Sequence, residues 1–407
     1  MKIRTITLFL NPSWPFDREV LGIAEPFIAA ARTAYEKSGY EVQTTRLASV
    51  PFPQLVTSLE TTEIVQMAQS LEAVAKLAGF EYVSIGPALP QMPASYTVVP
   101  EVLAATDSVF LSGMLTTSDS ISLVAVRACA EVIHRSAGLS PDGFANLRFS
   151  ALANVPPGVP FFPAAYHDGK EPTFALGVES ADLAVKAFTR AATLDEARQT
   201  LTESIEHHAR TLAGVGRALA RRKGVRFGGI DFSLAPYPEE ALSIGTAMER
   251  LGVPAVGLHG TLAVAALLTD ILERARFPHT GFNGLFLPVL EDAKLAHRAA
   301  EGSLTVKDLL LYSAVCGTGL DTLPLPGDTS PEALAAILLD LACLAQRLGK
   351  PLTARLMPIP GKATGDPTNF DFSYFANSRV MSLQAGPLVG ALGRSERLEL
   401  HPRGKKP

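Results

Sequence analysis

The chain opens with KIRTITLFL at residues 2–10, REVLGIAEPFIAAARTAYEKSG at 18–39 and YEVQTTRL at 40–47, and this unit decides the fold. The first and last segments alternate apolar or β-branched residues with small or polar ones, which is the period of a strand. Residues 18–38 carry apolar side chains at helical spacing, and Gly39 follows as a stop signal. A strand, a helix and a second strand predict a parallel pair, because parallel strands need a crossover connection.

The same alternation of short strands and helices continues along the chain. Further strands are expected at 82–85, 109–111, 147–155, 173–177, 225–234, 285–290 and 353–357. Helices are expected at 58–77, 119–135, 238–251, 261–275 and 330–349, and two helices at 181–223 with a junction near Thr193 or Asp195. Helices that recur between strands predict an α/β fold with a largely parallel sheet or barrel.

Composition narrows the class of protein. The 407 residues are 47% apolar and only 19% charged, so the chain buries a large core, a subunit interface or both. The formal net charge of −4 gives no basic excess that would favour nucleic-acid binding. No apolar stretch approaches the roughly 20 residues of a membrane span, so no membrane partner is expected.

Three widely separated cysteines form no CxxC pair, which argues against a zinc knuckle and fits a reducing cytoplasm. Phosphate-binding P-loop, GxSxG and HExxH motifs are also absent. We expect one large domain over residues 1–393 with a loose tail at 394–407. The apolar, proline-rich loop 155–163 is the best candidate for a boundary.

Two segments place polar residues next to glycines. In GGIDFS at 228–233, Asp231 stands at the end of an apolar strand, where ligands of parallel sheets bind, or else caps a turn. In GFNG at 281–284, the glycines around Asn283 allow close approach of backbone to a ligand or a second strand. The acids Glu291 and Asp292 that follow are expected to begin a helix ending near residue 300.

A third segment, YSAVCGTGLDT at 312–322, sets a cysteine between an apolar helix and two glycines. Exposed amides beside the sulfur would lower its pKa, and a buried inert thiol is the alternative. The candidate site residues of this segment are Cys316, Gly317, Thr318, Gly319 and Asp321.

A fourth segment, TARLMPIPGKATGD at 353–366, ends an expected strand in a Pro/Gly loop. Arg355 and Lys362 together could clamp a carboxylate or phosphate, and Asp366 adds a polar group. The alternative is a surface loop with solvated charges.

These segments carry a family resemblance. The motifs are MKIRTITLFLN, GGIDFSLAP, GFNGLFLPVLED, LLLYSAVCGTGLDTLPLPGD, PLTARLMPIPGKATGD and FDFSYFANSRVM. Together, from residue 2 to about 381, they resemble the prokaryotic family called domain of unknown function 711. The resemblance implies a fold similar to the pyruvate formate-lyase-like glycyl radical enzymes. That fold is a ten-stranded α/β barrel of two parallel five-stranded halves with a loop in its centre.

The resemblance also bears on function. In glycyl radical enzymes one loop presents a cysteine and another the radical glycine, positions that Cys316 and residues 360–366 resemble. The Arg-Val-x-Gly-Tyr pattern of the radical loop is absent here, so no glycyl radical is predicted. Some relatives stand beside a small ACT-domain protein, which implies metabolite regulation in that group.

We therefore expect an enzyme of unspecified reaction that acts on a small polar or anionic metabolite inside the barrel. Cys316 would be the thiol, Arg355 and Lys362 the anion-binding residues, and Asp231, Asp321 or Asp366 the acid/base. Carboxylates could alternatively hold Mg²⁺ or Ca²⁺. The competing hypothesis is a non-catalytic metabolite-binding regulatory protein that works with an ACT-domain partner. The apolar composition also favours a homodimer.

Overall fold

A computed structural model describes residues 1–16 and 22–403. The first four residues of the helix expected at 18–38 and the end of the expected tail lie outside this part of the chain. The centre of the fold is a mixed sheet of nine strands in the order β8-β7-β1-β2-β3-β4-β6-β10-β9. The α/β class expected from the alternation is confirmed.

The first half of the chain forms five neighbouring parallel strands. They are β1 (Lys2–Phe9), β2 (Val42–Ala48), β3 (Tyr82–Ala88), β4 (Val109–Met114) and β6 (Phe149–Ala153). The helices that connect them are α1 (Ala24–Lys37), α2 (Thr61–Leu77), α3 (Ala94–Thr97), α4 (Val99–Ala105) and α5 (Leu123–Ala137). This half confirms the crossover connections predicted from the opening unit.

The second half adds two parallel pairs, one at each end of the sheet. They consist of β7 (Thr173–Glu179) with β8 (Arg226–Ala235), and β9 (Gly319–Pro326) with β10 (Leu352–Ile359). β7 lies antiparallel to β1, and β10 lies antiparallel to β6. The two halves of the sheet therefore run in opposite directions.

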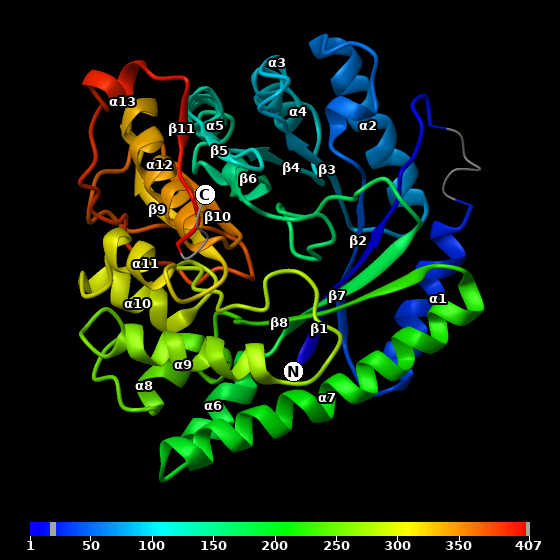
Figure 1. Ribbon diagram of the computed structural model, residues 1–407, viewed down its shortest axis with the longest axis vertical. Coiled ribbons are helices and arrows are strands. Elements are labelled where there is room, and N and C mark those ends of the chain that lie inside the picture. Colours follow the sequence, from blue (N-terminus) through cyan, green and yellow to red (C-terminus); the bar gives the residue numbers. More distant parts are fainter. Residues whose placement is uncertain (17–21, 404–407) are drawn as a thin grey trace.

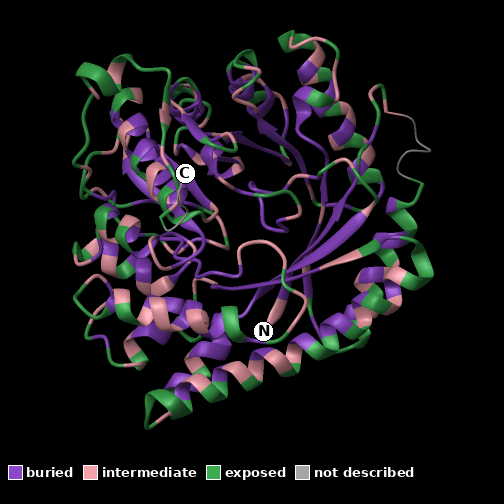
Figure 2. Cartoon of the chain, in the orientation of Figure 1, coloured by how far each residue is buried: buried purple, intermediate pink, exposed green. Residues whose placement is uncertain are grey.

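Helices cover the outside of this sheet (Figure 1). Those of the second half are α6 (Ala181–Arg190), α7 (Leu194–Lys223), α8 (Ile244–Arg250), α9 (Thr261–Arg274), α10 (Ala293–Glu301), α11 (Val306–Tyr312), α12 (Pro331–Leu348) and α13 (Gly390–Arg394). A small ribbon pairs β5 (Ser120–Ser122) with β11 (Arg397–Glu399). Figure 2 shows the buried strands inside a shell of helices whose outward faces are exposed. None of the helices described combines the length and apolar character needed to cross a bilayer.

Residues 278–290 run beside both outer strands of the sheet, β8 and β9. The amide of Ile230 in β8 donates to Pro278 O (2.8 Å), and the amide of Phe286 donates to Ser233 O (3.0 Å). Further along, the amide of Val289 donates to Asp321 O in β9 (3.0 Å). The regular strand expected at 285–290 is wrong, because the segment makes only isolated bridges.

The loop 155–166 packs against the inner strands of the sheet. Val159, Phe161 and Phe162 are buried, and the hydroxyl of Thr7 in β1 donates to Pro160 O (2.7 Å). The proline-rich loop that was the candidate for a domain boundary is therefore a buried segment of the interior.

Gly319 permits the close approach of β9 to β10. It has φ +102°, and a Cβ built on it would lie 2.1 Å from Thr353 O. Gly302, which ends α10, has a similar φ of +81° but open space around the position of its Cβ. A comparison of substitutions at Gly319 and Gly302 therefore separates the cost of steric overlap from the cost of backbone strain at positive φ.

We expect Gly319→Ala to lower the free energy of unfolding by about 1–3 kcal/mol more than Gly302→Ala, because only the first methyl overlaps backbone. Urea denaturation of both variants measures the difference. Equal losses would show that strand β9 can shift to accept the methyl group.

Candidate functional site

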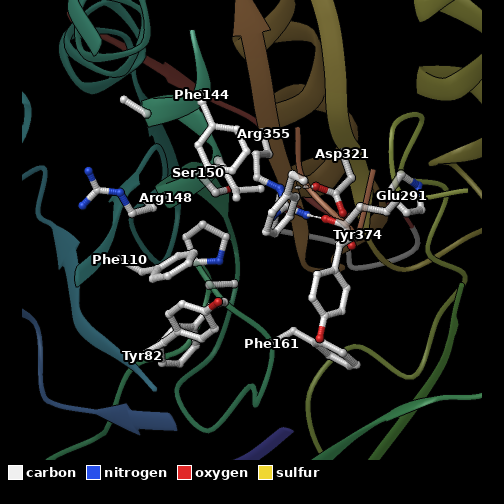
Figure 3. A pocket seen from close by; sticks show the side chains of 18 of the residues that line it. Tyr82, Phe110, Phe144, Arg148, Ser150, Phe161, Glu291, Asp321, Arg355 and Tyr374 are labelled. Atoms are coloured by element: carbon white, nitrogen blue, oxygen red, sulfur yellow. Dashed lines mark hydrogen bonds and ion pairs between the residues drawn. The ribbon is translucent and has the colours of Figure 1, made fainter. Parts of the chain in front are cut away.

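A cavity of about 540 Å³ lies between the two halves of the sheet (Figure 3). Side chains from both halves line it, including the first residue of β3, the second residue of β6 and the last residue of β8. Its charged or hydroxyl-bearing lining residues are Arg4, Thr44, Arg46, Tyr82, Thr106, Asp107, Ser140, Arg148, Ser150, Glu291, Asp321, Thr353, Arg355 and Tyr374. The rest of the lining is apolar, so the few charges sit among hydrocarbon.

A continuous chain of five charged side chains, which we call the ion chain, runs along one wall of the cavity. Four of the five line the cavity, and Glu179 at one end lies behind them, outside the lining. Arg4 pairs with Glu179 (Nη1–Oε2 3.1 Å) and with Glu291 (Nη2–Oε2 2.9 Å). Arg355 pairs with Glu291 (Nη2–Oε1 2.6 Å) and with Asp321 (Nε–Oδ1 2.6 Å). Two arginines thus alternate with three carboxyl groups, and Glu291 joins the two arginines.

The sheet brings these residues together from distant parts of the sequence. Arg4 and Glu179 come from the antiparallel pair β1 and β7. Asp321 and Arg355 come from the parallel pair β9 and β10, while Glu291 follows residues 278–290. Figure 3 shows Arg355 between Asp321 and Glu291. The ion chain therefore connects three separate stretches of the sheet.

Burial decides the protonation of this wall. It raises the pKa of Asp321 above its ordinary value, and the neighbouring Arg355 only partly offsets this effect. Burial raises the pKa of Glu179 in the same way, against the opposing influence of Arg4. Burial opposes the charge of Arg355, but Asp321 and Glu291 raise its pKa and keep it cationic. Asp321 is thus a carboxyl group whose proton is held more tightly than in water.

Arg46 in β2 lines the same cavity but belongs to no ion pair within the described residues. Its Nε donates to the hydroxyl of Thr44 (3.0 Å), and both terminal nitrogens have no hydrogen-bond partner in that part of the chain. Its guanidinium carbon lies 5.1 Å from the ring centroid of Phe162 and 5.6 Å from that of Tyr82. Burial, followed by repulsion from Arg4, lowers the pKa of Arg46 to about 10.

Tyr374 covers the ion chain from the C-terminal part of the protein. Its ring lies 4.3 Å from the guanidinium carbon of Arg4 and stacks edge-on with Tyr237 (5.5 Å). Burial raises the pKa of Tyr374. Two residues of the segment FDFSYFANSR, Phe372 and Tyr374, therefore line the cavity.

Of the residues expected at the site, Asp321 and Arg355 line the cavity and contact each other. The expected clamp of Arg355 with Lys362 is wrong, because the partners of Arg355 are carboxylates and Lys362 lies outside the cavity lining. Asp366 is also outside the lining and accepts a hydrogen bond from the amide of Ala363 (2.8 Å), as a loop residue.

The expected placement of Cys316 in the site is a second correction. Its side chain is 0% exposed and belongs to the hydrophobic core, outside the cavity lining. The ammonium of Lys350 donates to the carbonyls of Ser313 (3.0 Å), Ala314 (3.3 Å) and Cys316 and so caps the end of α11. The glycines after the cysteine bring backbones together and leave its sulfur in hydrocarbon.

Gly317, Gly319 and Thr318 serve that packing. A Cβ on Gly317 would lie 3.1 Å from the Cα of Gly284, and the hydroxyl of Thr318 donates to Leu285 O (2.6 Å). These contacts join the segment before β9 to residues 278–290. None of the three residues lines the cavity.

Asp231 and Asn283 form a second contact between backbones, also outside the lining. The carboxylate of Asp231 accepts from the amides of Phe282 (2.7 Å), Asn283 (3.1 Å) and Ser233 (3.1 Å) and from the hydroxyl of Ser233. The side chain of Asn283 accepts from the amide of Phe232 (3.0 Å). Burial raises the pKa of Asp231 to about 6 against these donors. The geometry therefore favours Asp231 as a residue that caps a turn over Asp231 as a ligand-binding residue.

Asp292 begins α10 as expected, accepting from the amides of Lys294 and Leu295 (2.9 Å each). Glu291, assigned from sequence to the same helix start, instead turns into the ion chain. Within the described residues no group of three or more His, Cys, Asp or Glu side chains is placed to hold a metal ion.

The sequence reasoning missed Arg4, Arg46 and Glu179. The available signal was an arginine in the middle of KIRTITLF and another in VQTTRLA, both otherwise strands of a buried sheet. A charge inside a strand that is covered on its other face by helices must point into the interior.

Comparisons with known proteins agree on one family. The profile described as "Uncharacterised ACR (DUF711)" matches residues 1–377. A "UPF0210 protein" of Pyrobaculum arsenaticum is 33% identical over 395 residues, covering 90% of this chain and 87% of the relative. A "UPF0210 protein" of Oleidesulfovibrio alaskensis is 30% identical over 438 residues, covering 100% and 95%. None of these names states a reaction.

We expect Arg355→Met to lower the free energy of unfolding by about 3–5 kcal/mol at neutral pH, because it leaves Asp321 buried without a cation and leaves Glu291 with Arg4 alone. The folded-state pKa of Asp321 then rises further above its unfolded value. The loss should therefore shrink as the pH falls through the acidic range, where protonation removes the unpaired charge. Urea denaturation across pH measures both effects.

The matched control is Arg135→Met, which breaks a pair with Glu101 whose partners are each 41% exposed. It should cost about 0–1 kcal/mol and show no such pH dependence. A similar loss in both variants would mean that the ion chain contributes no more than a surface pair.

We also expect Cys343 to react with iodoacetamide before Cys129 and Cys316, because it alone is partly exposed while the other two are 0% exposed. Reaction should be slow even there, since burial raises the pKa of Cys343 to about 11. Peptide mass spectrometry after limited labelling identifies the order. Labelling in urea, where all three thiols are accessible, is the control. If Cys316 were labelled faster than Cys343 in the folded chain, its thiol would be accessible and would again be a candidate site residue.

Proposed function

The chain belongs to the uncharacterised family DUF711, and for it we propose an enzyme that acts on a small anionic metabolite held by Arg46 in the cavity. The family names state no reaction, so the proposal depends on the chemistry of the lining. The single observation that carries it is a cavity lined both by an arginine without a carboxylate partner, Arg46, and by the buried carboxyl group of Asp321.

Arg46 is suited to binding an anion. Its two terminal nitrogens form a planar fork that matches the two oxygens of a carboxylate or phosphate. A cation among apolar side chains is costly without a counter-charge, and the four carboxyl groups nearest in the ion chain and lining are either bound by other arginines or outside salt-bridge distance. A bound anion would provide that counter-charge.

Asp321 supplies the acid/base chemistry in this proposal. A carboxyl group that keeps its proton closer to neutral pH can donate it to a substrate and accept it back. Arg355 holds this carboxyl group through its Nε and acts as a positioning residue. Glu291 connects Asp321, through Arg355, to Arg4 and so couples the charges of the wall.

The fold supports an enclosed site of this kind. We infer that residues 278–290 act as a tenth strand, because they hydrogen bond to β8 on one side and to β9 on the other. The sheet would then close into a barrel of two parallel halves, similar to the pyruvate formate-lyase-like fold. The proposal gives Cys316 no part in the chemistry, since its sulfur lies in the apolar core.

The test is an incubation of the full chain with an anion-exchange fraction of small cellular metabolites, followed by mass spectrometry. We expect one anionic component to be consumed by the unaltered protein and to persist with Arg46→Met or Asp321→Asn. A substitution of Arg226, which lies on the surface paired with Glu171, should leave consumption unchanged. Circular dichroism confirms that each variant is folded.

The outcomes separate the two classes of function. Consumption that continues in folded Arg46→Met contradicts the proposed site. A component that is retained by the unaltered protein through Arg46 and never converted would instead support the non-catalytic metabolite-binding protein, and would remove Asp321 from any catalytic role.

A further inference from the structure

Resting on the proposed function, we infer that the anionic ligand carries an aromatic body: an aromatic carboxylate or an aryl phosphate. Nine of the cavity's lining residues are phenylalanine or tyrosine, although aromatic residues form only 7% of the chain. They are Tyr82, Phe110, Phe144, Phe161, Phe162, Phe282, Phe286, Phe372 and Tyr374.

The aromatic rings nearest the arginine form one cluster. Phe110 stands edge-on to Tyr82 (5.3 Å between centroids) and tilted against Phe162 (5.3 Å). Arg46 lies over Tyr82 and Phe162. A ligand whose acid group binds Arg46 must therefore place the atoms beside that group against aromatic faces and edges, which favour another aromatic ring.

A second group of rings lines the cavity around Phe286, which comes from the second half of the chain. Phe286 packs edge-on against Phe161 (4.8 Å) and Phe282 (5.9 Å). The cavity of about 540 Å³ is well above the ~150 Å³ that holds a benzene molecule, so a ring and its acid group fit together.

The hydroxyl groups of the lining argue against a sugar acid or another polyhydroxylated anion. Thr44 donates to Arg4 O (2.7 Å), and Thr106 donates to Val102 O (2.7 Å). Ser150 donates to Ala354 O (3.1 Å), and Thr353 donates to Thr318 O (2.9 Å). These four hydroxyl protons are already committed to backbone, which leaves the hydroxyl groups of Tyr82, Ser140 and Tyr374 without a partner among the described residues. Three hydroxyl groups replace few of the hydrogen bonds that a polyhydroxylated anion would lose to water.

The arginines that line the cavity leave room for a single acid group on the ligand. Arg4 and Arg355 are both occupied by carboxylates of the ion chain. Arg148 directs its donors to Leu103 O (2.6 Å), Val109 O (3.2 Å) and the hydroxyl of Thr106 (3.3 Å). Arg46 alone keeps its terminal nitrogens available among the described cavity arginines, so the ligand presents a single acid group.

Isothermal titration calorimetry of the full chain tests this with phenylacetate, phenyl phosphate, acetate, inorganic phosphate, gluconate and benzyl alcohol. We expect phenylacetate or phenyl phosphate to bind at least about tenfold more tightly than the small anion with the same acid group, and than gluconate. Which of the two binds better distinguishes a carboxylate from a phosphate ligand. Benzyl alcohol, which has the ring without the charge, should bind at least about tenfold more weakly.

Two variants separate the ring from the charge. Phe110→Leu should weaken the aromatic acid at least about fivefold and leave acetate unchanged, whereas Phe80→Leu, at a buried site outside the cavity, should change neither. Arg46→Met should weaken every anion. Thermal melts show whether each variant is folded, and Phe110→Met replaces Phe110→Leu where the latter does not fold.

The failures are distinguishable. Acetate, phosphate or gluconate binding through Arg46 as tightly as the phenyl acids overturns the aromatic body and leaves the proposed function standing. Neither phenyl acid binding at about 1 mM also overturns it. Anion binding that persists in folded Arg46→Met overturns the aromatic inference and the proposed site together.

Discussion

The ion chain is the constraint on which the interior depends. Two arginines and three carboxyl groups lie among buried side chains, and each arginine bridges two acids. Buried charges are tolerated only where partners and geometry offset the loss of water. The residues that supply these partners come from β1, β7, β9, β10 and the turn after residues 278–290. The packing of both halves of the sheet is therefore tied to one electrostatic arrangement.

Against this background Arg46 stands out, because the same interior that pairs Arg4 and Arg355 leaves it with aromatic neighbours and one hydroxyl acceptor. The contrast is local: Arg4 and Arg46 come from adjacent parallel strands. The proposed function accounts for this difference by an anionic ligand that pairs with Arg46.

Much of the fold could be predicted from sequence. The helix beginning at Ser330 and Pro331 and the strands near 82, 225 and 353 follow from caps, spacing and alternation, and the structure confirms them. The site was harder to predict, because polar residues near glycines occur both in ligand-binding loops and where two backbones pack closely. Gly317 and Gly319 allow backbones to meet, and that requirement produces the same pattern as a ligand loop. Asp321 was selected because it follows the glycines after Cys316, and Arg355 because its strand ends in a Pro/Gly loop. A search for charges inside apolar strands would also have found Arg4.

Arg4 lies near the beginning of the chain, yet its two acidic partners are 175 and 287 residues away. During synthesis the first strand therefore emerges long before Glu291 exists. An N-terminal half-sheet made before residue 291 would have to keep this guanidinium hydrated, because one of its two carboxylate partners is still missing. Full burial of Arg4 therefore requires most of the polypeptide to have been synthesised.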